Sequence, residues 1–89
     1  MRRSREELKE FLVEHGVDVS PRGLEEALAL HGWEIAIEAD THDGCVVHAV
    51  PANRHLVDEI VGFGDAPGDT RLAVMRVLEQ VIDQGEPTV

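Results

Sequence analysis

Hydrophobic residues near the start of the chain recur at the three- and four-residue spacing of an α-helix. Leu8 and Leu12 fall on one face of that helix. Ser4 and Glu7 form an S-x-x-E pattern, in which each side chain accepts a hydrogen bond from the other residue's backbone N–H group. Gly16 favours the left-handed conformation that ends a helix. The pattern predicts a helix that begins after Ser4 and ends before Gly16.

A second helical pattern follows directly. Ser20 is placed to cap it, and Pro21 suits the first helical position, where its missing N–H group costs nothing. Leu24 begins the inner face of this helix, and Gly32 ends it. We expect residues 1–32 to form a helical hairpin.

The periodicity changes from helical spacing to two in the segment WEIAIEAD, residues 33–40. Strict alternation is the pattern of a half-buried β-strand. One face of this predicted strand is apolar and carries Trp33, Ile35, Ile37 and Ala39. The other face carries Glu34, Ala36, Glu38 and Asp40.

Two further strands and a helix are predicted after it. CVVHAV, residues 45–50, follows an Asp-Gly turn and is stopped by Pro51. HLVDEIVGFG, residues 55–64, is ambiguous between a strand and a helical turn, and its β-branched residues favour a strand for the latter half. Helical spacing of apolar residues predicts a last helix over about residues 71–84.

The predicted element order is α-α-β-β-β-α, which is an α+β fold. A three-stranded antiparallel sheet with the last helix across one face is the simplest packing, because one apolar sheet face must be covered. The length of 89 residues suits a single domain, in which residues 33–89 form a β-β-β-α unit beside the N-terminal hairpin.

Composition indicates a soluble cytoplasmic protein. No apolar run approaches the roughly 20 residues that span a bilayer. The start, MRRSREELKE, lacks the apolar segment of a signal peptide. The one cysteine cannot form an internal disulfide, which is typical of a reducing compartment.

Charge narrows the classes of partner. The formal net charge is −10, from 18 acidic and 8 basic residues. Residues 1–29 hold seven acidic and five basic residues, a net of −2, whereas residues 30–89 hold eleven and three, a net of −8. Affinity for phosphate needs clustered Lys and Arg, so direct binding to nucleic acid or to an anionic membrane is disfavoured. The charge favours a basic partner, or serves solubility alone.

The stretch GFGDAPGDTRLAVMRVL, residues 62–78, carries a family resemblance. A Gly-rich strand, a turn, a Thr cap and an amphipathic helix resemble the double-stranded-RNA-binding-domain-like fold, and especially HicB-type antitoxins, over residues 33–84. The RNA-binding members place lysines at the start of the last helix, where this chain has Asp69, Thr70 and Arg71. The resemblance therefore implies the antitoxin branch, whose members bind a basic toxin through an acidic surface.

The segment THDGCVVHAV, residues 41–50, holds the candidate chemistry of the chain. His42, Cys45 and His48 have the types and spacing of zinc ligands, with Asp40 or Asp43 as a fourth ligand. In a strand, however, Cys45 and His48 face opposite ways. Cys45 is also disfavoured as a nucleophile with His42 or His48 as its base, because proximity in sequence does not supply the needed geometry and a lone cysteine of buried type is usually a small hydrophobic residue. We predict no metal, no cofactor and no enzymatic activity.

Carboxylates at strand spacing are the remaining feature, and they form the predicted partner-binding surface. Its residues are Glu34, Glu38, Asp40, Asp43, Asp58, Glu59 and Asp65. Such an array can imitate a phosphate backbone, or it is a solvated face. We predict a non-enzymatic inhibitor that blocks a basic nucleic-acid-handling complex, of the phage anti-defence or anti-CRISPR type. The alternatives are a HicB-like antitoxin against a small basic toxin, a small metal- or ligand-binding domain, and a structural subunit, with a homodimer as one possible state.

Overall fold

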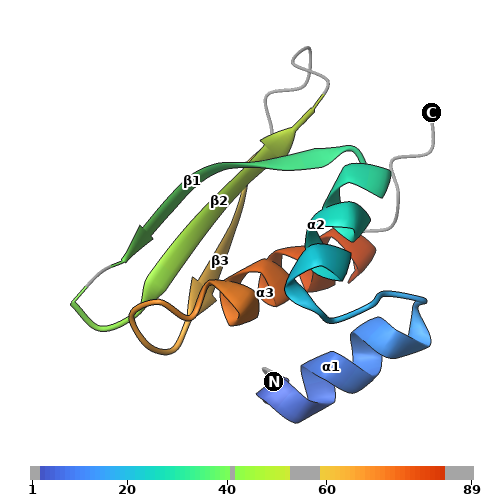
Figure 1. Ribbon diagram of the computed structural model, residues 1–89, viewed down its shortest axis with the longest axis horizontal. Coiled ribbons are helices and arrows are strands. Elements are labelled where there is room, and N and C mark those ends of the chain that lie inside the picture. The colour runs from blue at the N-terminus through green and yellow to red at the C-terminus, as the bar shows by residue number, and fades with distance from the viewer. Residues whose placement is uncertain (1–2, 41, 53–58, 84–89) are drawn as a thin grey trace.

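The computed structural model describes residues 3–40, 42–52 and 59–83. Helices α1 (Arg5–Glu14) and α2 (Pro21–Leu30) come first, then strands β1 (Trp33–Asp40), β2 (Cys45–Pro51) and β3 (Ile60–Gly64), and last helix α3 (Thr70–Asp83) (Figure 1). The strands form one antiparallel sheet in the order β1-β2-β3. The predicted α+β fold class and element order are confirmed. The latter half of residues 55–64 is a strand, as expected.

The predicted helix caps are present. The Ser4 hydroxyl accepts a hydrogen bond from the Glu7 backbone N–H, and the Glu7 carboxylate accepts one from the Ser4 N–H. The Ser20 hydroxyl accepts a hydrogen bond from the Gly23 N–H at 3.1 Å. Gly16 has a φ of 78°, in the left-handed region that favours glycine. Local sequence signals therefore set where α1 and α2 begin and where α1 ends.

Helix α3 is the centre of the core. Every residue from Leu72 to Leu78 is buried. Helix α3 packs on β2 and β3, and α1 and α2 each pack against α3. Helix α1 lies farther from the sheet than α3 does (Figure 1). The two helices predicted as a hairpin are thus both anchored on α3. None of the helices described is long and apolar enough to cross a membrane.

The helix and the sheet come closest at Gly62 in β3. A Cβ atom at this position would lie 2.1 Å from the Ala73 carbonyl oxygen and 2.7 Å from Val77 Cγ2. Only the absence of a side chain allows this approach. Gly62 therefore sets the distance between β3 and α3.

A β-bulge interrupts β1 at Ala36. Ile35 lies opposite Ala49, and Ile37 lies opposite His48, so two steps along β1 match one step along β2. The extra residue inverts the alternation of the strand from this point onward. The prediction that Ile35 and Ile37 share one face of β1 is therefore wrong.

Candidate partner-binding surfaces

The bulge divides the carboxylates that were predicted to share one face of β1. Directly opposed residues in an antiparallel pair share a face. Glu34 lies opposite the half-buried Val50, on the side away from the helices. Glu38 lies opposite Val47, which is fully buried beneath α3. Asp40 lies opposite the buried Cys45, on the same side as Glu38. The continuous acidic strand face expected from the sequence does not form.

Three further predicted carboxylates, Asp43, Glu59 and Asp65, lie at the ends of the sheet. Asp43 is exposed in the turn between β1 and β2. Asp65 directly follows β3, and its Oδ1 lies 3.7 Å from the Arg76 guanidinium. Glu59 directly precedes β3, and its Oε2 lies 3.2 Å from His48 Nδ1. Asp58 lies outside the described residues.

Asp40 has a structural contact of its own. Its Oδ1 accepts a hydrogen bond of 2.7 Å from the Gly68 backbone N–H. Gly68 has a φ of 80°, in the loop between β3 and α3. The Asp40 side chain therefore holds this loop against the end of β1, a role made possible by the bulge that turns Asp40 toward the helices.

Two adjoining hollows form a groove between α2 and β1, which we call the α2–β1 groove. The hollows measure about 230 and 200 Å³ and share Glu25 and Ile35 as lining residues. Each is smaller than the roughly 300–1,000 Å³ typical of small-molecule sites. The groove has an apolar floor and an acidic rim, built from Leu24, Glu25, Leu28, Trp33, Glu34, Ile35, Glu38 and Val74.

Among the described residues, carboxylates outnumber cations in the α2–β1 groove, with Glu25, Glu34 and Glu38 against Arg71. Glu25, Glu34 and Glu38 form no ion pair with any residue in the described ranges. The described ranges contain six Lys and Arg side chains, and five of them form ion pairs with other carboxylates. These five are Arg3, Arg5, Lys9, Arg22 and Arg76. The sixth, Arg71, lines the groove, where its Nε donates to the Val19 carbonyl at 2.9 Å and its positive charge offsets one of the three carboxylates. The groove is therefore an apolar channel with a net negative rim.

The strand alternation separates the candidate metal ligands as expected. Cys45 is 2% exposed on the helix side of the sheet, where its Sγ lies 3.7 Å from the Thr70 hydroxyl. His48 faces the opposite side, beside Glu59. His42 is exposed in the turn. Within residues 3–40, 42–52 and 59–83, no three His, Cys, Asp or Glu side chains come together as a metal site would require.

The side of the sheet away from the helices is mainly apolar, and we call it the open face. No described element packs on it. It consists of cross-strand neighbours from all three strands, namely Glu34, Ile37, Ala39, Val46, His48, Val50, Val61 and Phe63. Ile37 and Phe63 keep 54% and 55% of their surface exposed. An antiparallel sheet that faces water normally alternates with polar residues on that side, so this face is unusual.

Sequence reasoning missed three residues of these two surfaces. Glu25 lies on the exposed side of α2 and was not linked to β1 by any local pattern. Ile37 was expected in the core, because a bulge leaves no mark in simple period-two counting. Phe63 had a usable signal, since it alternates with the buried Gly62 and Gly64.

Comparison with protein-family models, with curated proteins and with solved structures found no match for this chain. The resemblance to HicB-type antitoxins accordingly remains a prediction from the sequence.

Proposed function

We propose that this protein is a non-enzymatic, cytoplasmic inhibitor that binds a basic segment of a nucleic-acid-handling protein in the α2–β1 groove. The observation that carries the proposal is the excess of carboxylates, Glu25, Glu34 and Glu38 against the single Arg71, around an apolar floor. A partner with Lys or Arg beside apolar side chains complements such a groove.

The proposal differs from imitation of a phosphate backbone. Imitation requires regularly spaced carboxylates on one surface, and the bulge at Ala36 removes that regularity from β1. Apolar contacts in the groove supply affinity in the proposal, whereas the carboxylates supply orientation and a faster association rate.

The direct test uses a labelled short peptide that alternates lysine with leucine, and a control peptide in which glutamate replaces every lysine. Fluorescence anisotropy should detect binding of the lysine peptide only, and this binding should weaken as salt screens the charges. Glu25→Lys and Glu38→Lys should each weaken it by about 5- to 30-fold, because each replaces an attraction by a repulsion, about 1–2 kcal/mol in all.

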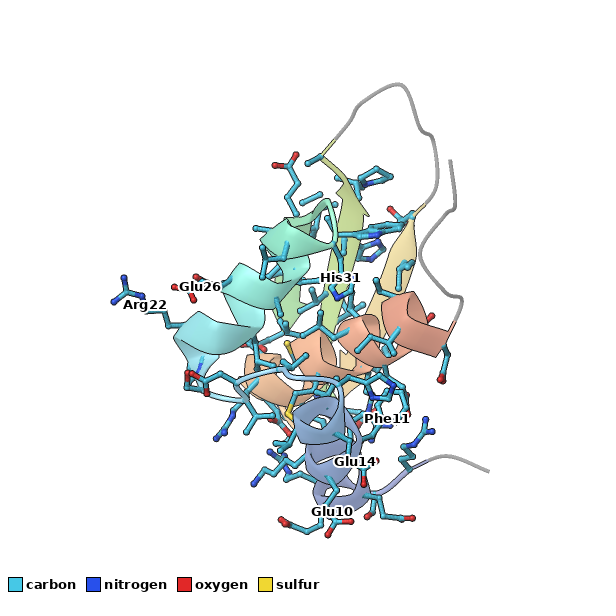
Figure 2. All side chains as sticks on the ribbon, turned by 90° about the vertical axis from the view of Figure 1, so that its right-hand side faces the viewer. Glu10, Phe11, Glu14, Arg22, Glu26 and His31 are labelled. Carbon is cyan, nitrogen blue, oxygen red and sulfur yellow. The ribbon has the colours of Figure 1, made fainter. Side chains whose placement is uncertain are left out.

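Glu26→Lys is the matched control. It makes the same charge change one residue along the same helix, at a side chain that does not line the groove. Figure 2 shows Glu26 beside Arg22 on the outer side of α2, and the two form an i,i+4 ion pair of 3.4 Å. If Glu25→Lys and Glu26→Lys weakened peptide binding equally, the change in net charge alone would explain the loss. That result would refute the groove as the binding site.

A further inference from the structure

We infer that the partner inserts an arginine side chain at the end of the α2–β1 groove beside Trp33, an inference that rests on the proposed function. We call this end the arginine pocket. It is the hollow of about 230 Å³ between the last turns of α2 and the start of β1. Its lining residues are Glu25, Leu28, Ala29, Trp33, Glu34 and Ile35.

The two ends of the α2–β1 groove differ in charge. Ala29, in the last turn of α2, and Trp33, the first residue of β1, line the arginine pocket. Pro21, the first residue of α2, and Glu38, late in β1, line the other hollow. Each hollow is lined by two carboxylates, but Arg71 lines only the second. Among the described residues, the arginine pocket therefore has the larger excess of negative charge.

The carboxyl end of α2 adds negative potential at the arginine pocket. Helix α2 ends at Leu30, and no basic residue lies in its last turn. The aligned peptide dipoles give the carboxyl end of a helix a partial negative charge, which stabilises a nearby cation. The other end of the groove contains the first residues of α2 and α3, Pro21 and Thr70, where the dipoles have the opposite sign. The helix dipoles and the side-chain charges thus both favour a cation beside Trp33.

Trp33 favours arginine over lysine as that cation. Trp33 is half-buried against the core and also lines the arginine pocket. Tryptophan is the strongest cation–π partner among the side chains, and a planar guanidinium stacks on its ring and is more weakly hydrated than an ammonium. The guanidinium fork also matches a carboxylate such as Glu25, which lines the pocket from α2. An arginine side chain therefore complements both the ring and the charge.

Three short labelled peptides test which side chain the pocket takes. They alternate leucine with arginine, with lysine, or with citrulline, which has the shape of arginine without its charge. In fluorescence anisotropy with the full chain, the arginine peptide should bind about 3- to 10-fold more tightly than the lysine peptide, because only the guanidinium stacks well on Trp33. The citrulline peptide should bind most weakly, because it lacks the charge that the carboxylates attract.

Trp33 also reports directly on the pocket. It is the only tryptophan of the chain, which has no tyrosine. Its fluorescence emission should therefore change as an unlabelled arginine peptide binds, with the same dissociation constant as the anisotropy. This measurement uses the wild-type protein and depends on no variant.

Trp33→Leu keeps an apolar side chain but removes the ring, and it should lower the affinity for the arginine peptide to that for the lysine peptide. Trp33→Phe keeps a weaker cation–π partner and should give an intermediate preference. Phe63→Leu is the matched control, since it replaces an aromatic residue by leucine on the open face, where Phe63 is 55% exposed. It should leave the arginine preference unchanged. Circular dichroism verifies that each variant is folded.

Several results would overturn the arginine pocket and leave the groove as the binding site. They are equal affinity of the wild-type protein for the arginine and lysine peptides, an arginine preference that persists in Trp33→Leu, an equal loss of that preference in Phe63→Leu, and peptide binding that leaves the Trp33 emission unchanged. If none of the peptides bound, the proposed function would itself be refuted, and the arginine pocket with it.

Discussion

Gly62→Ala tests the helix–sheet contact on which the groove depends. The added Cβ would lie 2.1 Å from the Ala73 carbonyl oxygen, whereas ordinary contact begins at 3.4 Å. Helix α3 must therefore retreat locally by about 1.3 Å, the difference between these distances. The obstructing atom belongs to the helix backbone and cannot rotate away.

The expected cost is large for a domain of this size. Overpacking a core costs about 1–3 kcal/mol, and a backbone obstruction belongs at the upper end. The lower entropy of the unfolded alanine chain returns about 0.4–1 kcal/mol. The net loss of about 2–3 kcal/mol in unfolding free energy corresponds to a Tm lowered by roughly 10–20 °C. Because α3 contributes Thr70, Arg71 and Val74 to the α2–β1 groove, basic-peptide binding should weaken as well.

Urea denaturation followed by circular dichroism measures the free energy of unfolding. Gly16→Ala is the control, since Gly16 has a φ of 78° and no atom within 4 Å of an added Cβ. Gly16→Ala should lower the unfolding free energy only through the left-handed backbone penalty of about 1–2 kcal/mol. The lower entropy of the unfolded alanine chain offsets part of this loss, as it does in Gly62→Ala. Combining Gly62→Ala with Val77→Ala should not restore stability, because the Ala73 carbonyl remains. A Gly62→Ala protein within about 0.5 kcal/mol of wild type would refute the close approach of β3 and α3.

Three further predictions concern single contacts. Hydrogen bonds from the Ser4 and Ser20 N–H groups lower the pKa values of Glu7 and Asp18 below their usual 4.5 and 3.8. Each ionised carboxylate therefore stabilises the fold fully above its usual pKa, and this stabilisation is lost as pH falls through the lowered pKa. Glu7→Gln should weaken the fall of the unfolding free energy at acid pH, measured by urea denaturation at a series of pH values. An unchanged fall would contradict this prediction. Asp40→Asn should lower the unfolding free energy by about 1 kcal/mol, because it weakens the hydrogen bond from the Gly68 N–H. The Gly68 amide should then exchange its hydrogen faster, and an unchanged exchange rate would show that the Asp40 contact is dispensable. Cys45, 2% exposed, should react with a thiol reagent only as fast as the protein opens, whereas rapid reaction in native buffer would show that it is accessible.

The sequence by itself determined the local elements. Ser4, Ser20 and Pro21 set the helix starts because a cap acts through atoms within three residues of itself. The Asp-Gly turn and Pro51 were enough to bound β2, and in the structure its alternation puts Cys45 and Val47 on the buried side. The order of six such elements was enough to predict the α+β class and the antiparallel sheet.

Only the tertiary structure decided which residues form the candidate partner-binding surfaces. The bulge at Ala36 belongs to the pairing of β1 with β2, and it turns Asp40 toward Gly68; neither contact is local in sequence. One extra residue moved Glu38 to the helix side and Ile37 to the open face. The neighbourhood of Glu25 and Glu38 likewise depends on how α2 packs beside β1. Strand period is a local property, whereas the face that a strand presents is set by its partners.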